Sequence, residues 1–197
     1  MCTVTFIPVN EKIFITSNRD EKKERAMALP PAFYSYSGCE KILYPRDPAA
    51  NGTWIALREN GDAAVLLNGA FIPHRPQPTY RKSRGLVLLD ILSTEKPALS
   101  FTTANLSCIE PFTLVILESG SLHEFRWDGT EKYSRVLAAN QPHIWTSATL
   151  YDGLAARKKE EAFSGFLQQH SVPTQKDIMD FHQDKNERII NYFVMPE

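Results

Sequence analysis

Cys2 is the residue whose type and position best suit covalent chemistry. Once Met1 is removed, as small second residues generally permit, Cys2 carries a free α-amine with a pKa of roughly 7.7 to 8.0. A useful fraction of this amine is unprotonated near neutral pH, so it can act as base for a thiol whose ordinary pKa is about 8.5. A neighbouring cation lowers the thiol pKa further. This pair predicts a nucleophile that attacks a carbonyl carbon without a histidine.

The element that must position Cys2 is a β-hairpin. Two segments rich in β-branched and aromatic residues flank a short polar turn, namely residues 2–8 (CTVTFIP) and 12–17 (KIFITS). With residues 10 and 11 at the centre of the turn, paired positions sum to 21 and Cys2 lies opposite Arg19. A slip of one residue pairs it with Asn18 or Asp20 instead. Directly opposed Cβ atoms lie roughly 4.5 to 5.5 Å apart, so the thiol must sit beside the run 18–21.

The same residues allow a purely structural interpretation. Cysteine is among the most buried residue types, so Cys2 could be a small apolar residue at the start of a strand. Arg19 and Asp20 could form an ordinary surface ion pair. Strand alternation also sends these two side chains to opposite faces unless a bulge or turn intervenes. On the hairpin alone both interpretations are open.

The opening MCTVTFIPVNEKIFITSNRDE resembles the NRDE family, which is named for the motif at residues 18–21 and includes the transport and Golgi organisation protein 2 group. Shorter likenesses follow at Asn51–Trp54 (the family's GGTW segment), Leu67–Asn68 (a strand end), Ser83–Gly85 (an SRG helix start) and Pro111–Phe112 (the start of an apolar strand). The resemblance covers roughly residues 1–130.

This family is similar in turn to the N-terminal-nucleophile hydrolases of the penicillin V acylase and bile-salt hydrolase kind. The resemblance implies an α+β fold, a four-layer αββα sandwich of antiparallel sheets. It also implies a cysteine nucleophile acting through its own amine, with an arginine and an aspartate positioning both groups, and Cys2, Arg19 and Asp20 match these roles. An asparagine on a following strand commonly helps to form the oxyanion hole, and Asn68 is the matching position. Such a donor often contributes roughly 3 kcal/mol to the stability of the transition state.

Four further residues are supporting candidates, namely Asn18, Glu21, Arg84 and Ser147. Ser147 follows Thr146 where relatives typically have a Ser-Asn pair, and a serine hydroxyl can donate one hydrogen bond in place of the amide. Arg84 either anchors the first helix or reaches an anionic group of the substrate. The chain ends soon after residues 192–194, which leaves little room for the extra C-terminal strands of such a sheet.

Hairpins and helices interleave along the rest of the chain. Strands are predicted at residues 53–58 and 62–67, joined by a two-residue primed turn at Asn60-Gly61, and in a meander at 112–118, 121–127 and 132–137. Helices are predicted from about Arg81 to Leu92, over residues 153–170, and over 174–182 with Thr174 as its cap. Residues 73–78 (PHRPQP) form a loop. Three aromatic residues are expected in the core or in a pocket wall: Trp54, Phe71 and Trp145.

Composition narrows the class of protein. The 197 residues fit one domain, and 22 Lys and Arg against 23 Asp and Glu give a formal charge of −1, which makes nucleic acid an improbable partner. No apolar run reaches the roughly 20 residues of a transmembrane segment. Three cysteines without a CxxC pair argue for a reducing cytoplasm, with Cys39 and Cys108 as inert packing residues. Neither a metal nor a cofactor is expected, since the histidines lack ligand spacing and no haem or phosphate-loop motif is present.

Three functions remain open. The first is hydrolysis or acyl transfer at an amide (C–N) or thioester through an acyl-Cys2 intermediate, on a small-molecule substrate. The second is a non-catalytic carrier or trafficking module for haem, lipid or acyl-coenzyme A, the kind of role associated with the transport and Golgi organisation group. The third is a purely structural domain. The sequence is compatible with an oligomer and assigns no particular substrate.

Overall fold

The computed structural model describes residues 3–18, 26–148, 153–183 and 190–196, and it contains two antiparallel sheets. In spatial order, the smaller sheet consists of β10 (His143–Thr146), β1 (Thr3–Val9), β2 (Lys12–Asn18) and β11 (Ile190–Pro196). The larger sheet consists of β3 (Leu29–Tyr36), β4 (Cys39–Arg46), β5 (Ile55–Arg58), β6 (Ala63–Asn68), β7 (Phe112–Glu118), β8 (Ser121–Trp127) and β9 (Lys132–Leu137).

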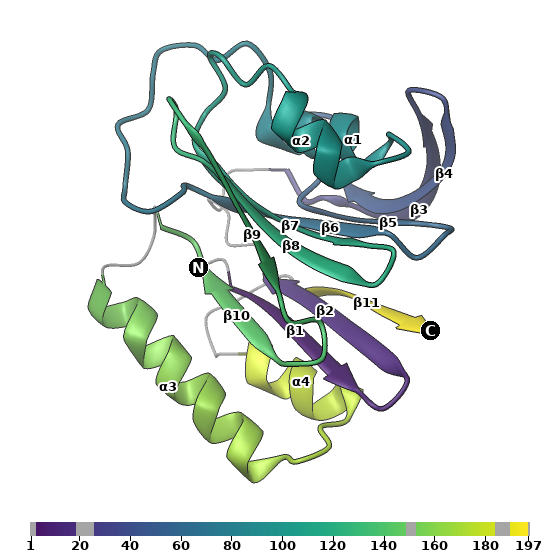
Figure 1. Ribbon diagram of the computed structural model, residues 1–197, viewed down its shortest axis with the longest axis vertical. Coiled ribbons are helices and arrows are strands. Elements are labelled where there is room, and N and C mark those ends of the chain that lie inside the picture. Colours follow the sequence, from purple (N-terminus) through teal and green to yellow (C-terminus); the bar gives the residue numbers. More distant parts are fainter. Residues whose placement is uncertain (1–2, 19–25, 149–152, 184–189, 197) are drawn as a thin grey trace.

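Helices cover the outer face of each sheet (Figure 1). The larger sheet carries α1 (Arg84–Leu92) and α2 (Pro97–Thr103), and the smaller sheet carries α3 (Gly153–Gln169) and α4 (Gln175–His182). The layers therefore run helix, sheet, sheet, helix, which confirms the predicted αββα sandwich.

Three apolar clusters fill the spaces between the four layers. The central cluster joins the two sheets and includes Val4 and Phe6 of β1 with Val65 of β6. The side chains of β1 alternate between the two faces of the sheet, as in any strand: Ile7 packs into the cluster beneath α3 and α4. The third cluster lies between α1, α2 and the larger sheet. Even-numbered positions of β1 thus face the other sheet.

The register of the first hairpin is confirmed. Val4 pairs with Ser17 and Val9 with Lys12, so paired positions sum to 21 as predicted. The turn is closed by Asn10, whose φ of 54° lies in the left-handed region that asparagine tolerates well. Residues 2 and 19–21, which carry most of the predicted chemistry, lie outside the described residues.

The second hairpin has the predicted strands but a different turn. Asp62 O accepts from Arg58 N at 2.8 Å, and Arg58 O accepts from Gly61 N at 3.0 Å, so the loop has three residues. Gly61 has a φ of 90°, which glycine adopts without strain, whereas Asn60 is absent from the positive-φ positions among the described residues. The predicted two-residue primed turn is therefore wrong, and the loop is of the type with glycine at its left-handed position.

Helices α3 and α4 and the meander β7–β9 match their predicted ranges within one residue. Thr174 caps α4 through a capping box with Asp177, as expected for a threonine at this position. Helix α1 begins at Arg84 and not near Arg81, because the side chain of Ser83 accepts a hydrogen bond from Leu86 N and starts the helix there.

Several elements escape the sequence patterns. Strand β3 carries two consecutive prolines, Pro30 and Pro31, which a strand tolerates only at the edge of a sheet, and β3 is an edge strand. Helix α2 has seven residues and begins at a proline, and β10 has only four residues. Strand β11 shows that residues 190–196 do form a C-terminal strand, paired along β2, where little room was expected.

A contact between two glycines explains why two of the short family-like segments belong together. A Cβ on Gly85 would lie 2.6 Å from the backbone oxygen of Thr53, and one on Gly52 would lie 2.6 Å from the carbonyl carbon of Gly85. The segment at 51–54 therefore packs directly on the first turn of α1. Gly85 lowers helix propensity, but this close approach requires it.

We predict that Gly85→Ala destabilises the protein by about 1 to 3 kcal/mol, although alanine is the better helix former, because the added methyl group collides with backbone. The measurement is urea unfolding followed by circular dichroism. Gly165→Ala in α3 is the matched control, since nothing lies within 4 Å of its Cβ position, and it should stabilise by up to about 1 kcal/mol. Equal stabilisation by both alanines would contradict the steric interpretation.

Candidate active site

The ends of β6 and β10 meet between the two sheets. The hydroxyl of Ser147, which is fully buried, donates a hydrogen bond to the backbone oxygen of Asn68 at 2.8 Å. On the neighbouring strand Thr3 pairs with Thr146. Two of the predicted residues, Asn68 and Ser147, are therefore in contact, and both lie at the sandwich end where β1 begins, one residue after Cys2 in the chain.

Asn18 has a different environment from Asn68. Its side chain is 1% exposed and contacts α4 through His182: Nδ2 donates to the backbone oxygen of His182 at 2.7 Å, and Oδ1 contacts its Nδ1. Thr5 Oγ1 lies 2.8 Å from Nε2 of the same ring. Asn18 thus connects the end of β2 to α4. Its amide lies on the face of the smaller sheet that is turned away from the larger sheet, and there it stabilises the packing of the helix.

The contacts around His182 determine which ring nitrogen carries the proton. Because the Asn18 amide nitrogen faces a carbonyl, its oxygen must accept from Nδ1, and Nε2 then accepts from the Thr5 hydroxyl. Burial, with a smaller contribution from Lys159, lowers the pKa of His182 to about 3. The imidazole is therefore neutral in the folded protein near neutral pH.

Arg84 anchors the start of α1. Its Nη2 forms an ion pair with Glu110 Oε2 at 3.0 Å, and Nη1 donates to the backbone oxygen of Pro111 at 3.2 Å. Glu110 also contacts Nε2 of His74 at 3.1 Å. These contacts support the first of the two roles predicted for Arg84, because they fasten α1 to the segment that leads into β7.

A buried carboxylate that sequence analysis did not single out lies beside this end of the sandwich. Glu124 is 4% exposed and accepts from Arg126 Nε at 2.8 Å, Arg135 Nη2 at 2.7 Å and Trp145 Nε1 at 2.6 Å. Burial alone would raise the pKa of Glu124, but the hydrogen bonds from Arg135, Arg126 and Trp145 outweigh it and hold the pKa below its ordinary value. Glu124 is thus a carboxylate that links both sheets.

Part of this cluster could have been found from sequence. Glu124 and Arg126 are two residues apart in a predicted strand and share one face. The register that sets Glu124 opposite Arg135 was not predicted, but it follows if the predicted strands are paired from their adjoining ends, Trp127 with Lys132, as the structure shows. The contribution of Trp145 had no such signal, because β10 was not predicted. Trp54 and Trp145 are buried in the central cluster as expected, and Phe71 is half exposed. Cys108 is exposed, so its expected packing role is wrong, and the side chain of Cys39 is outside those described.

A cleft of about 280 Å³ opens beside Ser147. It is bounded by β8, β9, β10 and α3, and six residues characterise it: Phe71, Arg126, Arg135, Trp145, Ser147 and Glu160. We call this cleft the arginine pocket. Since Ser147 and Thr146 both line it, the pocket adjoins the start of β1.

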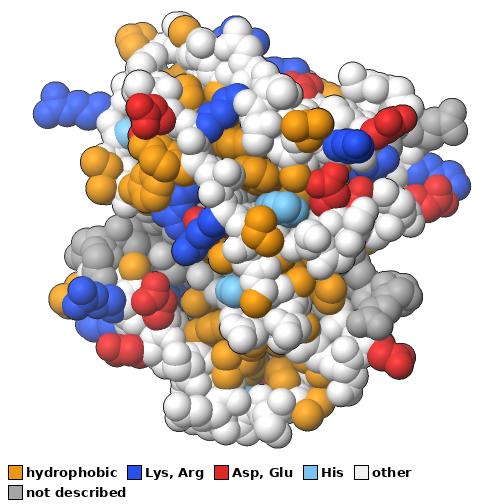
Figure 2. Space-filling view, in the orientation of Figure 1, with side chains coloured by type: hydrophobic (Ala, Val, Ile, Leu, Met, Phe, Trp, Pro, Cys, Tyr) orange, Lys and Arg blue, Asp and Glu red, His pale blue; other side chains and the backbone are white. Residues whose placement is uncertain are grey.

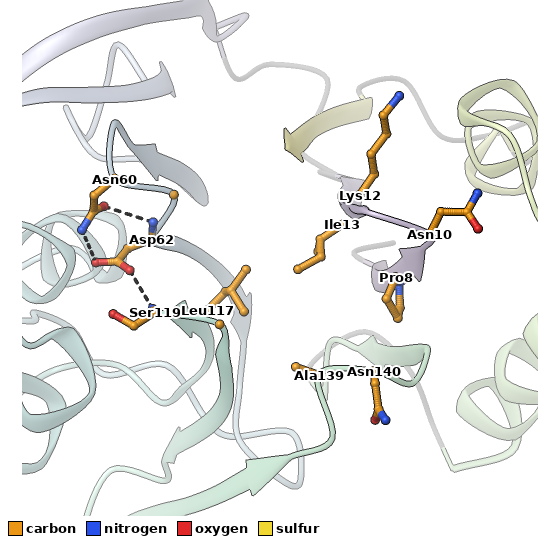
Figure 3. Close-up of a pocket in the computed structure, with 12 residues that line it drawn as sticks. Pro8, Asn10, Lys12, Ile13, Asn60, Asp62, Leu117, Ser119, Ala139 and Asn140 are labelled. Atoms are coloured by element: carbon orange, nitrogen blue, oxygen red, sulfur yellow. Dashed lines mark hydrogen bonds between the residues drawn. The ribbon is translucent and has the colours of Figure 1, made fainter. Parts of the chain in front are cut away.

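A larger cleft, of about 650 Å³, lies at the opposite end of the sandwich, between the turns that follow β1, β5 and β7 and the segment before β10 (Figure 3). Its buried carboxylate, Asp62, already accepts from Asn60 Nδ2 at 2.8 Å and from Ser119 N at 2.9 Å. Strand β1 spans seven residues, so this cleft is roughly 20 Å from Thr3. The candidate active site is therefore the smaller opening.

Comparison with solved structures identifies the fold. The fold is similar to that of an ortholog of N-acylethanolamine-hydrolyzing acid amidase from Caenorhabditis elegans, with a TM-score of 0.69 and 10% sequence identity over 99% of this chain and 92% of that chain. The chain thus has the fold of the N-terminal-nucleophile hydrolases. Over residues 1–191 the sequence matches the Transport and Golgi organisation 2 family, and the protein belongs to that family. The match extends well past residue 130, where the visible resemblance ended.

Among proteins with curated descriptions, none matches the sequence. Within the residues that the structure describes, no helix is both long and apolar enough to cross a membrane.

We predict that His182 makes the fold sensitive to acid. Its pKa of about 3 in the folded state lies below the ordinary value of 6.5, so the unfolded chain binds more protons as the pH falls from about 6.5 to 3. Stability should be lost across that window, by about 2 kcal/mol between pH 7 and pH 5 from this residue alone. Urea unfolding at both pH values measures it.

The matched variant is His182→Gln, which keeps hydrogen-bonding groups but cannot titrate. Its stability should change less between pH 7 and pH 5 than that of the unmodified protein, by the same 2 kcal/mol or so. Equal losses in the two proteins would show that His182 is not the acid-sensitive group.

Proposed function

We propose that this protein is an N-terminal cysteine hydrolase that cleaves a C–N (amide) or acyl bond through an acyl-Cys2 intermediate. The observation that carries the proposal is the position of Thr3: β1 begins directly after Cys2, at the junction where Asn68 and Ser147 connect the two sheets. The similar solved structure is described as an amide-hydrolysing enzyme, which agrees with this chemistry.

Strand alternation supports the orientation that the proposal needs. Val4 and Phe6 of β1 face the other sheet, and the proposal requires this alternation to continue to Cys2, two positions before Val4. On β2, Ile15 faces that sheet and Asn18 faces the helices, and the proposal requires Arg19 on the face to which Ile15 points. It also requires a turn or bulge after β2 that brings Asp20 to that same face.

In the proposed reaction, loss of Met1 frees the α-amine of Cys2, which takes the thiol proton. The thiolate attacks the substrate carbonyl carbon and forms a tetrahedral oxyanion. Collapse of this intermediate breaks the C–N bond, and the leaving amine takes the proton back from the α-ammonium group. Water, deprotonated by the same amine, then hydrolyses the thioester and regenerates the thiol. Arg19, with Asp20 and Glu21 next to it, would hold the amine and the thiolate in place.

The two described site residues have separate roles in this scheme. Asn68 ends β6, and its backbone oxygen meets Ser147 beside the start of β1. For its side-chain amide to stabilise the oxyanion, the proposal requires the end of β6 to turn that amide away from the helix-facing side that Leu66 and its strand partner Phe112 share. Ser147 donates its single hydroxyl proton to the Asn68 backbone oxygen, so it holds Asn68 in position. We therefore assign Ser147 as a positioning residue, in place of the hydrogen-bond donor expected from the family pattern.

We predict that Cys2 alone forms a covalent adduct with an electrophilic acyl probe such as an N-acyl β-lactam. Intact mass spectrometry should show loss of Met1 and one added acyl group, with the adduct mapped to the N-terminal peptide. Cys2→Ala should abolish both the adduct and turnover. Cys108→Ala is the control, since Cys108 is an exposed thiol, and it should leave both unchanged.

Retained Met1, or turnover by Cys2→Ala, would exclude the proposal. The carrier function for haem, lipid or acyl-coenzyme A predicts something different. Under that alternative, Cys2→Ser binds its ligand as well as the unmodified protein does, and no covalent adduct forms.

We predict that Asn68→Ala lowers kcat by about 10²- to 10³-fold with a smaller effect on KM, because an oxyanion donor acts on the transition state. Steady-state kinetics on an N-acyl amide measures it, with circular dichroism as a check on folding. The matched control is Asn140→Ala, an exposed asparagine beside the distant larger cleft, which should keep full activity. A change in KM alone would assign Asn68 to substrate binding.

A further inference from the structure

The arginine pocket has more hydrogen-bond donors than the described protein can use. Arg126 donates from Nε to Glu124 and from Nη1 to the backbone oxygen of Ala70, at 2.6 Å. Its Nη2 is therefore available to donate to a ligand. Among the described residues, Arg135 donates only from Nη2, to Glu124, so its Nε and Nη1 are also available to a ligand. Its side chain is 60% exposed and therefore reachable by a ligand.

The pocket's buried acid cannot satisfy these donors. The two oxygens of Glu124 already accept three N–H groups, from Arg126, Arg135 and Trp145. Arg126 and Arg135 with the buried Glu124 carry a net charge of +1, and the exposed carboxylate of Glu160 on α3 offsets that charge. The unused donors therefore favour a ligand that brings anionic oxygen atoms.

An aromatic surface adjoins these donors. The guanidinium of Arg126 lies over the ring of Phe71 at 4.8 Å, and Phe71 meets Tyr133 edge to face at 4.9 Å. Both rings are substantially exposed, at 52% for Phe71 and 40% for Tyr133. Figure 2 shows basic side chains beside hydrophobic ones in the indentation above α3. An apolar part of a ligand can therefore lie next to its anionic group.

We propose that the arginine pocket binds an anionic substituent of the substrate, a carboxylate or a phosphate, with Arg135 as the principal contact and Arg126 as the second. This inference rests on the proposed hydrolase function, and it narrows the substrate to an amide that carries a negative charge close to the scissile bond. The short distance between that charge and the scissile bond follows from Ser147, which lines the pocket and directly follows Thr146, the strand partner of Thr3.

Glu160 provides an internal check on the sign of the charge. It lines the pocket from α3, its side chain is exposed, and it forms no ion pair within the described residues. A carboxylate at this position opposes an anion and attracts a cation. Its removal should therefore tighten the binding of an anion, whereas the removal of Arg135 should weaken it.

The test uses the Cys2→Ala protein, in which binding is measured without turnover. Isothermal titration compares N-lauroylglycine and N-lauroyl-O-phosphoethanolamine with the uncharged N-lauroylglycinamide. We expect the charged probes to bind about tenfold more tightly than the amide. Adding Arg135→Gln should remove this advantage and leave binding of the amide unchanged. The stronger of the two charged probes identifies carboxylate or phosphate as the preferred group.

Two further variants complete the test. Glu160→Gln should tighten binding of the charged probes by a few-fold. Lys41→Gln removes a cation from β4, four strands away from β8 in the same sheet, and should change nothing. Equal affinity for charged and uncharged probes, or an equal loss of all three with Arg135→Gln, would overturn the proposal.

The result is separable from that of the proposed hydrolase function. Arg135-dependent binding of the charged probes, combined with turnover in a Cys2→Ala protein, would keep the anion site and reject the nucleophile. Turnover that requires Cys2 but does not distinguish charged from uncharged amides would keep the nucleophile and reject the anion site.

Discussion

The packing of two antiparallel sheets face to face is the constraint on which the rest of this structure depends. Each sheet alone would expose an apolar face, and the central cluster built from Val4, Phe6, Val65 and their neighbours removes both faces from water. Once the sheets are stacked, the end of β6 and the end of β10 must meet, and the hydrogen bond from Ser147 to Asn68 and the Glu124 to Trp145 contact fix how they do so. The candidate site is a consequence of that meeting.

The sequence predicted what depends on neighbours along the chain. The turn at residues 10 and 11 determined the register of the first hairpin, the turns around 119 and 128 determined the meander, and Thr174 with Asp177 determined the start of α4. The four-layer arrangement came from family resemblance, since a pattern of strands and helices does not say which sheet lies on which. Strand β3 was missed for a different reason: its two prolines weaken the local strand pattern, and the segment forms a strand only by pairing at the edge of the sheet.

For the site, the limit was long-range pairing. The contact between Asn68 and Ser147 joins residues 79 positions apart, and that between Glu124 and Trp145 depends on a strand of four residues. Gly85 shows the reverse case, in which the local rule misleads. By helix propensity it is a weak residue, but its lack of a side chain lets α1 approach the segment at 51–54. The sequence therefore identified candidate site residues more readily than it predicted which of them are in contact.

The position of β1 in its sheet has a consequence for the end of the sandwich at which this strand begins. Strand β1 is hydrogen-bonded on both sides, to β10 and to β2, so its first described residue, Thr3, belongs to an interior strand and not to a free end. The backbone entropy of Thr3 is therefore lost when the sheet forms and not when a ligand binds. The end of the sandwich beside Ser147 and Asn68 is thus an ordered support before any ligand arrives, and binding there does not have to supply the free energy of ordering it.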